Sequence, residues 1–272
     1  MKKDIIGQDR LVKELDRIFN IFQASKGEIR PHFILTGESG SSKSYSISNI
    51  AEEYKLGFIE VNAAQLTKEG TSGNSLSKAL SPLLTMGGKP CIIFVDEFDK
   101  LFISGNSNDS SAHESTTGVQ NEFLKVLESD TASVFGDYGK YINVPVKNAL
   151  FVFAGAFNGE ANITVDRLRE IGLKTEFLGR VGLVYNTNKL SLESMYTILD
   201  NSSLFVKYSK LFSGIDTEKA MYEIKSYIQK NYEMNTLGAR LINTLIHQYF
   251  IKGGVLTMHE VEEISFQNKL VL

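Results

Sequence analysis

Gly37-Glu38-Ser39-Gly40-Ser41-Ser42-Lys43-Ser44 is the stretch that decides the fold of this 272-residue chain. It follows the apolar run His32–Thr36 and precedes Tyr45–Tyr54, a segment able to form a helix. A glycine-rich turn between a strand and a helix lets successive backbone N–H groups point inward, and the helix N-terminus adds its positive dipole. The pattern is typical of a phosphate-binding loop, in which Lys43 reaches the β- and γ-phosphates of ATP and the Ser44 hydroxyl binds Mg²⁺. We therefore expect cofactor contacts from the whole loop, namely Gly37, Glu38, Ser39, Gly40, Ser41, Ser42, Lys43 and Ser44.

Ser42 breaks the usual form of this loop. The pattern G-x-x-x-x-G-K-[ST] has a second glycine where this chain has Ser42. Either the serine Cβ crowds the loop, or the residue adopts backbone angles that serine tolerates at a small cost. The sequence leaves both alternatives open. We expect ATP binding to survive, whereas the rate of hydrolysis depends on which alternative holds.

A second motif, which is acidic, lies downstream of this loop. The apolar run Cys91–Val95 leads directly into Asp96 and Glu97, and ligands of open α/β sheets collect at the carboxyl ends of the strands. Asp96 is expected to hold Mg²⁺, and Glu97 to polarise the water that attacks the γ-phosphate. A solvated acidic turn is the alternative, but the phosphate-binding loop upstream makes it the weaker one.

The distribution of apolar residues predicts two domains. Near-continuous apolar runs predict parallel strands that are covered on both faces, and their alternation with helical segments predicts a doubly wound α/β domain over residues 1–186. Residues 187–272 are expected to form a small helical lid domain, with a short strand near Ile264–Phe266. The Ser- and Asn-rich stretch 104–118 is predicted to be a loop. The five expected strands of the sheet are 32–36, 58–61, 91–95, 150–154 and 181–185.

Composition limits the other function classes. Hydrophobic residues make up 42% of the chain, which is enough for a sizeable core, and the net charge of -3 provides no global basic field for nucleic acid. The sequence shows no signal peptide, no apolar run of membrane-spanning length and no zinc-ligand spacing among its four histidines and single cysteine. We expect a cytoplasmic protein without membrane contacts.

Taken in order, the motifs resemble those of AAA+ ATPases, and more narrowly of the ClpX/HslU group of protein unfoldases. The resemblance covers nearly the whole chain. Beyond the two nucleotide motifs, its segments are Asp4–Gln8, Asp96–Lys100, Gly118–Gln120, Phe153–Phe157, Glu176–Arg180, Leu204–Phe212 and Gly238–Arg240.

The resemblance implies specific roles. Ile5 and Ile6 correspond to residues that line the adenine pocket. Arg180 corresponds to the arginine finger that reaches the nucleotide of a neighbouring subunit, and Arg240 to the second sensor, which contacts ATP from the small domain. A finger that acts in trans implies a homo-oligomeric ring, usually a hexamer, which hydrolyses ATP to remodel or translocate a protein partner.

The chain departs from the group at several places. It is expected to lack the zinc-binding N-terminal domain, and the segment between Phe157 and Glu176 is too short for the loop that docks on a peptidase. The aromatic first pore loop is replaced by Gly70-Thr71-Ser72-Gly73, which offers little apolar contact area. The polar first-sensor position falls at Ala154–Gly155, where Asn158 is a substitute only by proximity.

Three functions therefore stay open. The first is an ATP-hydrolysing ring that acts on a protein, without peptidase coupling. The second is a nucleotide-binding assembly subunit with weak turnover, which Ser42 and Thr71 favour but Glu97 and Arg180 oppose. The third is a DNA-acting motor or loader, which suits a polar pore but not the acidic charge balance.

Overall fold

The structure is a computed structural model of the chain. It describes residues 5–68, 73–102, 110–136, 139–212, 214–254 and 256, with backbone alone at 110–116. The predicted strand near Ile264–Phe266 and the pore-loop residues Gly70, Thr71 and Ser72 lie outside the described residues. Among the described residues, no helix is both long and apolar enough to cross a membrane.

The chain divides into two compact units, which are treated separately below. The first comprises residues 1–5, 9–38 and 43–187, and the second comprises residues 6–8, 39–42 and 188–272. The functional division at residue 186 stays a prediction. The helices of the first unit are α1 (Asp9–Ala24), α2 (Lys43–Glu53), α3 (Leu76–Ala79), α4 (Leu83–Met86), α5 (Ser110–Glu128), α6 (Val165–Glu170) and α7 (Thr175–Arg180).

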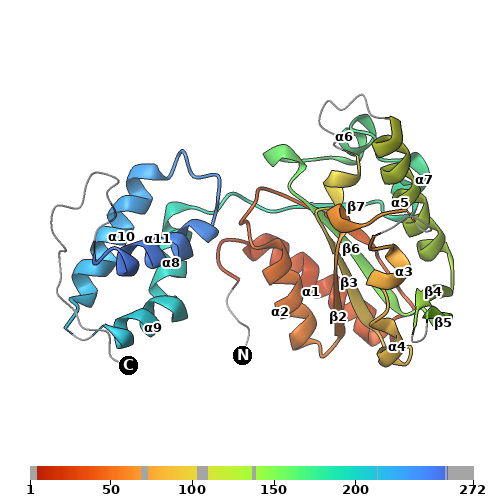
Figure 1. The fold of residues 1–272 in the computed structure, drawn as a ribbon, viewed down its shortest axis with the longest axis horizontal. Coiled ribbons are helices and arrows are strands. Elements are labelled where there is room, and N and C mark those ends of the chain that lie inside the picture. Colours follow the sequence, from red (N-terminus) through yellow and green to blue (C-terminus); the bar gives the residue numbers. More distant parts are fainter. Residues whose placement is uncertain are drawn as a thin grey trace. The chain divides into compact units, whose positions relative to one another are not determined.

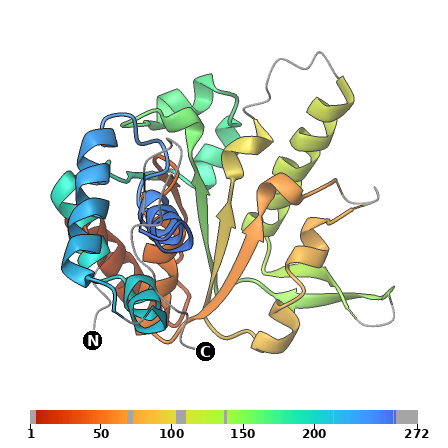
Figure 2. The same ribbon diagram turned by 60° about the vertical axis from the view of Figure 1, so that its left-hand side comes forward.

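A five-stranded parallel sheet forms the centre of the first unit, in the order β2-β3-β6-β1-β7 (Figure 1). The expected parallel sheet and α/β class are therefore confirmed. All five strands run in the same direction, so their carboxyl ends lie along one edge, as the arrows in Figure 2 show. The strands are β1 (Phe33–Thr36), β2 (Gly57–Asn62), β3 (Cys91–Asp96), β6 (Ala149–Gly155) and β7 (Leu183–Asn186).

Each face of the sheet is covered by a separate apolar core. Alternate residues of β1, β3 and β6 point to opposite faces, so Ile34 and Phe153 join one cluster while Leu35 and Val152 join the other. Helices α1 and α2 cover the second face, and α5 and α7 pack with the first (Figure 1). Coverage on both faces explains why these strands are apolar along nearly their whole length.

Two elements differ from the sequence expectation. Ser110–Glu128 forms the helix α5, so the predicted loop is wrong from residue 110 onward. Val119, Phe123 and Leu127 lie on one side of this helix and are buried in the core, and their packing outweighs the low helix propensity of the Ser- and Thr-rich first turns. A hairpin of β4 (Thr131–Phe135) and β5 (Tyr141–Pro145), which the sequence did not predict, follows α5.

The second unit is helical over its described residues and has its own core. The expected helical character of the region after residue 187 is confirmed. Ile224 and Ile228 are fully buried, as their spacing predicts, while Met221 is only half-buried. The helices are α8 (Leu192–Asp200), α9 (Ser203–Leu211), α10 (Thr217–Asn231) and α11 (Arg240–Ile251).

A buried histidine predicts a pH dependence of stability. His32 precedes β1, and its Nδ1 accepts a hydrogen bond from the backbone N–H of Phe151 in β6 (3.0 Å). Burial, reinforced by the positive charge of Arg30, lowers the pKa of His32 from 6.5 to about 4. Because the folded state disfavours the protonated ring, His32 contributes its full stability above pH 6.5 and loses it as the pH falls toward 4.

We expect the wild type to lose about 2 kcal/mol of unfolding free energy through this residue between pH 7 and pH 5. Urea unfolding gives the unfolding free energies of wild type and His32→Asn at both pH values. The difference between the two proteins isolates the contribution of His32, because the carboxylates contribute equally to both. An equal pH dependence in the two proteins would show that His32 does not titrate in this way.

Candidate nucleotide-binding and hydrolysis site

The loop between β1 and α2 has the backbone of a phosphate-binding loop. Gly37 and Gly40 have φ values of 145° and 73°, which side chains rarely allow. Ser42 has φ of 70°, so the serine adopts the left-handed conformation that glycine normally supplies at this position. Of the two alternatives left open by the sequence, the structure therefore supports the second: the loop keeps its shape, and serine tolerates a strained backbone.

Lys43 and Ser44 begin the helix that follows this loop. Lys43 is the first residue of α2, and its Nζ donates to the carbonyl oxygens of Gly37 (2.6 Å) and Glu38 (2.9 Å). These contacts fold the ammonium back over the loop. They place the positive charge where the helix N-terminus already favours an anion.

Asp96 and Glu97 follow at the carboxyl end of β3, on the sheet edge that also bears the loop. Asp96 is half-buried, and its Oδ1 accepts the backbone N–H of Glu97 (2.8 Å). Glu97 is exposed and has left-handed angles, with φ of 54° and ψ of 30°. The two carboxylates thus have different surroundings, since one is fixed at the strand end and the other projects into solvent.

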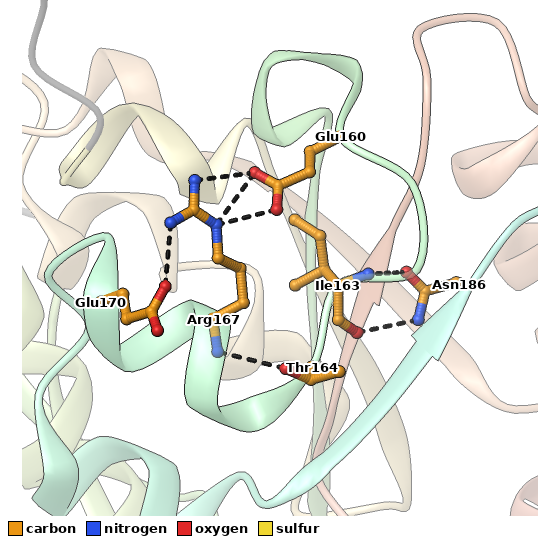
Figure 3. A network of polar contacts seen from close by, with 6 residues as sticks. All are labelled: Glu160, Ile163, Thr164, Arg167, Glu170 and Asn186. Atoms are coloured by element: carbon orange, nitrogen blue, oxygen red, sulfur yellow. Dashed lines mark hydrogen bonds and ion pairs between the residues drawn. The ribbon is translucent and has the colours of Figure 1, made fainter.

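A polar network anchors the strand that leads into the loop. Thr36, the last residue of β1, is fully buried and donates from Oγ1 to Asn186 Oδ1 (2.6 Å). Asn186 in turn pairs with the backbone of Ile163, accepting its N–H (2.7 Å) and donating to its carbonyl oxygen (3.0 Å) (Figure 3). The network ties the ends of β1 and β7 to the segment after β6 and fixes the point from which Gly37 leaves the sheet.

The arginines beyond β6 differ in how firmly they are held. Arg180, the last residue of α7, binds one oxygen of Glu128 through Nη2 (2.9 Å) and Nε (3.1 Å), and its side chain is 56% exposed. Arg167 instead binds both oxygens of Glu160 and also Glu170 (Figure 3). An exposed ion pair contributes about 0–1 kcal/mol, so Arg180 can exchange Glu128 for another anion at little cost.

The second unit contains Arg240 together with part of the loop. Arg240 is the first residue of α11 and is exposed, and its Nη1 donates to Ser39 Oγ (3.0 Å). The preceding residue, Ala239, donates its N–H to the carbonyl oxygen of Gly40 (3.1 Å). Within this unit, Arg240 therefore lies next to Ser39 of the loop, and its contact with nucleotide stays a prediction.

The remaining predicted positions are less informative. Ile5 packs against the core cluster around α1 and α2, and Ile6 is half-buried in the second unit. Asn158 is exposed and left-handed, with φ of 56°. The sequence did not point to Asp99, which is buried beside Gly155 at the end of β6. The unusual glycine at this strand end was the available signal.

Comparison with known proteins places the chain in a family. Residues 33–169, half of the chain, match the family described as ATPase family associated with various cellular activities (AAA). The chain belongs to this AAA family. The matched region runs from β1 to α6 and includes both the phosphate-binding loop and the acidic motif after β3.

The chain is also similar to curated AAA proteins over most of its length. It is 27% identical over 263 residues to the ATP-dependent Clp protease ATP-binding subunit ClpX of Bacteroides fragilis, covering 80% of this chain and 63% of the relative. It is 26% identical over 283 residues to ClpX 2 of Wolinella succinogenes, covering 89% of this chain and 70% of the relative. The resemblance to the ClpX group is thereby confirmed, although the chain spans less than two thirds of the Bacteroides fragilis protein.

The serine in the phosphate-binding loop of this AAA chain predicts a stabilising substitution. Ser42→Gly removes the left-handed strain, about 1–2 kcal/mol, and loses part of that gain to the greater freedom of glycine in the unfolded chain. We expect a net rise of about 0.5–1 kcal/mol in the unfolding free energy. Chemical denaturation measures it.

Ser42→Ala is the matched control, because alanine keeps the Cβ and the strained φ. The alanine variant should show no such rise. Equal stability of the glycine variant and wild type would mean that the serine is not strained in solution.

Proposed function

We propose that the chain binds and hydrolyses ATP as part of a homo-oligomeric ring that acts on a protein partner. The observation that carries the proposal is the loop from Gly37 to Ser44, whose left-handed Ser42 preserves the backbone of a phosphate cradle. In this reading, Lys43 contacts the β- and γ-phosphates, and the N-terminus of α2 supplies backbone N–H groups.

The residues at the sheet edge fit a magnesium ion. The Ser44 hydroxyl and the Asp96 carboxylate are oxygen donors, and Mg²⁺ is usually held by one or two carboxylates together with substrate phosphates. When bound, Mg²⁺ would neutralise charge on the β- and γ-phosphate oxygens. Asp96 is suited to this role because its Oδ1 is already fixed by the N–H of Glu97.

Glu97 is proposed to act as the base. Its exposed carboxylate can accept a proton from a water molecule beside the γ-phosphate, and the strained turn directs it away from the apolar core. Arg180 is proposed to serve the site of a neighbouring subunit. In favour of this role are the exposure of its side chain and its single-oxygen contact with Glu128, because such a pair is easily replaced.

A protein partner without peptidase coupling is the finer part of the proposal. The relatives are named as subunits of a Clp protease, which favours a protein substrate. In the segment between β6 and α7, however, the larger apolar residues are all used internally, leaving none for docking on a peptidase. They are Phe157, Ile163, Val165, Leu168, Ile171 and Leu173, and each is buried in the core or packed against it.

Steady-state phosphate release from wild type and Glu97→Gln tests the proposal. Turnover that is lost in the variant supports an ATPase, whereas ATP binding without turnover in either protein would indicate an assembly subunit instead. Stimulation by an unfolded protein supports a protein partner. Stimulation by DNA alone would overturn that part of the proposal in favour of a DNA-acting motor.

A further inference from the structure

Asp99 is a buried carboxylate in the acidic turn that follows β3. Its side chain is 1% exposed, while Glu97 and Lys100 on either side of it face solvent. Asp99 Oδ2 accepts the backbone N–H of Phe157 (3.3 Å) and lies 3.6 Å from Lys100 Nζ. A buried carboxylate is expensive unless it is hydrogen-bonded, so its position calls for a reason.

Gly155 supplies the space that Asp99 occupies. A Cβ on Gly155 would lie 2.6 Å from Asp99 Oδ1, 2.8 Å from Phe157 Cε2 and 3.0 Å from Asp99 Cβ. The φ angle of Gly155 is not among the positive values, so the backbone does not require glycine here. The neighbouring Asp99 carboxylate and the Phe157 ring together require it. The absence of a polar side chain at the end of β6 thus has a physical cause, since a side chain from the turn after β3 fills that place.

The same turn holds Glu97 in its strained conformation. Phe98 is fully buried, with its ring centroid 4.6 Å from Phe153 and 5.1 Å from Phe177. On the other side, Asp96 binds the N–H of Glu97. Glu97 therefore cannot relax its left-handed backbone unless Phe98 or Asp99 leaves its buried site.

We propose that Asp99 is a positioning residue for Glu97, and that its side chain provides the polar contact between the turn after β3 and the end of β6. By holding the N–H of Phe157, the carboxylate fixes the turn that bears Glu97 relative to the segment that leaves β6. This inference rests on the proposed ATP hydrolysis, because it assigns Asp99 an effect on the rate at which Glu97 works. Binding of ATP, which depends on Lys43 and the loop, is left intact.

The test compares Asp99→Ala, Asp99→Asn, Gly155→Ala and the double variant Asp99→Ala/Gly155→Ala. Phosphate release gives kcat and KM, a fluorescent ATP analogue gives the dissociation constant, and thermal unfolding reports the fold. We expect Asp99→Ala to lower kcat between about tenfold and a hundredfold, as a misplaced catalytic group does. Asp99→Asn should restore most of kcat, because its amide oxygen can still accept the N–H of Phe157.

Gly155→Ala should act like Asp99→Ala, because the added methyl displaces both the carboxylate and the ring of Phe157, the residue whose N–H that carboxylate accepts. The double variant should then be no slower than either single one, since both changes remove the same contact. Lys100→Ala is the control: it removes only the half-exposed partner of Asp99 and should leave kcat unchanged. The affinity for the ATP analogue should stay within about twofold of wild type in every variant.

The outcomes separate the two levels of the proposal. Wild-type protein that binds ATP without turnover would overturn the proposed hydrolysis, and this inference with it. Wild-type turnover that Asp99→Ala and Gly155→Ala leave unchanged would overturn the inference alone. The inference would also be overturned if Asp99→Asn and Asp99→Ala lost ATP affinity and thermal stability in parallel, because that would show a merely structural role. A double variant whose kcat defect is the product of the two single defects would overturn it for the same reason.

Discussion

Replacing Glu97 by glutamine is expected to stop steady-state ATP hydrolysis while ATP remains bound. The amide has nearly the same shape as the carboxylate, so the turn, the hydrogen bond from the N–H of residue 97 to Asp96 and the phosphate-binding loop should all persist. An amide cannot take a proton from the attacking water, and loss of a general base lowers the rate by about 10²–10⁴-fold. Phosphate release and equilibrium binding of an ATP analogue measure the two effects.

Glu60→Gln is the matched control for this variant. Glu60 is an exposed glutamate of β2 that lies in register with Phe94, so its replacement makes the same change of charge on the same sheet but not at a strand end. The control should keep wild-type turnover. Undiminished turnover in Glu97→Gln would mean that another group activates the water, and the proposed role of Glu97 would be abandoned.

Replacing Arg180 by alanine is expected to have an effect of similar or greater size. Arginine fingers contribute about 10³–10⁵ to the rate of nucleotide hydrolysis by stabilising charge on the transferred phosphoryl group. Among the described residues of the chain, Arg180 forms an exposed ion pair with Glu128, at the end of α5, so its loss should leave the core and the chain's own loop intact. The variant should therefore bind ATP and assemble, yet release almost no phosphate.

Mixing the two inactive variants tests whether the finger acts in trans. In a mixed ring, a subunit with Arg180→Ala still has Glu97, and a neighbour with Glu97→Gln still has Arg180. Such an interface has both groups, so mixing should restore part of the activity that neither variant has alone. No recovery in rings shown to be mixed would contradict a finger that acts between subunits.

Arg169→Ala is the control for removal of a surface arginine. Arg169 forms an exposed pair with Asp166 on α6, comparable to the pair of Arg180 with Glu128. Pairs of this kind contribute little to stability, so the control should retain turnover. A defect in this control equal to that of Arg180→Ala would show that the assay responds to any loss of charge on this surface.

The centre of the sheet could be predicted from the sequence because β1, β3 and β6 are buried on both faces. Runs such as Cys91–Val95 and Leu150–Ala154 are apolar without interruption, which few other elements allow. The hairpin of β4 and β5 could not be predicted in this way, since its strands are mostly exposed and only Ala132, Val134 and Val144 enter the core. The first turns of α5 escaped prediction because their composition is that of a loop.

The candidate site was predicted where it depends on residues close together in sequence. The loop from Gly37 to Ser44 and the pair Asp96-Glu97 each have a local spacing that can be recognised without a fold. Asp99 was not recognised, because the burial of a carboxylate there depends on Gly155, a glycine fifty-six positions along the chain (155 − 99). The conformation of Ser42 likewise required the structure.

The strained backbone at this site has a consequence for selection and engineering. Seven described residues other than glycine have positive φ, and five of them (Ser42, Glu97, Phe157, Asn158 and Asn162) lie in the connections that leave the carboxyl ends of β1, β3 and β6. Such positions cost about 1–3 kcal/mol each and persist only where the surroundings enforce them. In a library of variants screened for heat resistance alone, thermal stability would therefore rise most readily through substitutions at the edge where ATP is proposed to react. Such a screen should also select for ATP turnover, because otherwise the most thermostable variants will be those that have lost the backbone strain at the carboxyl edge of the sheet.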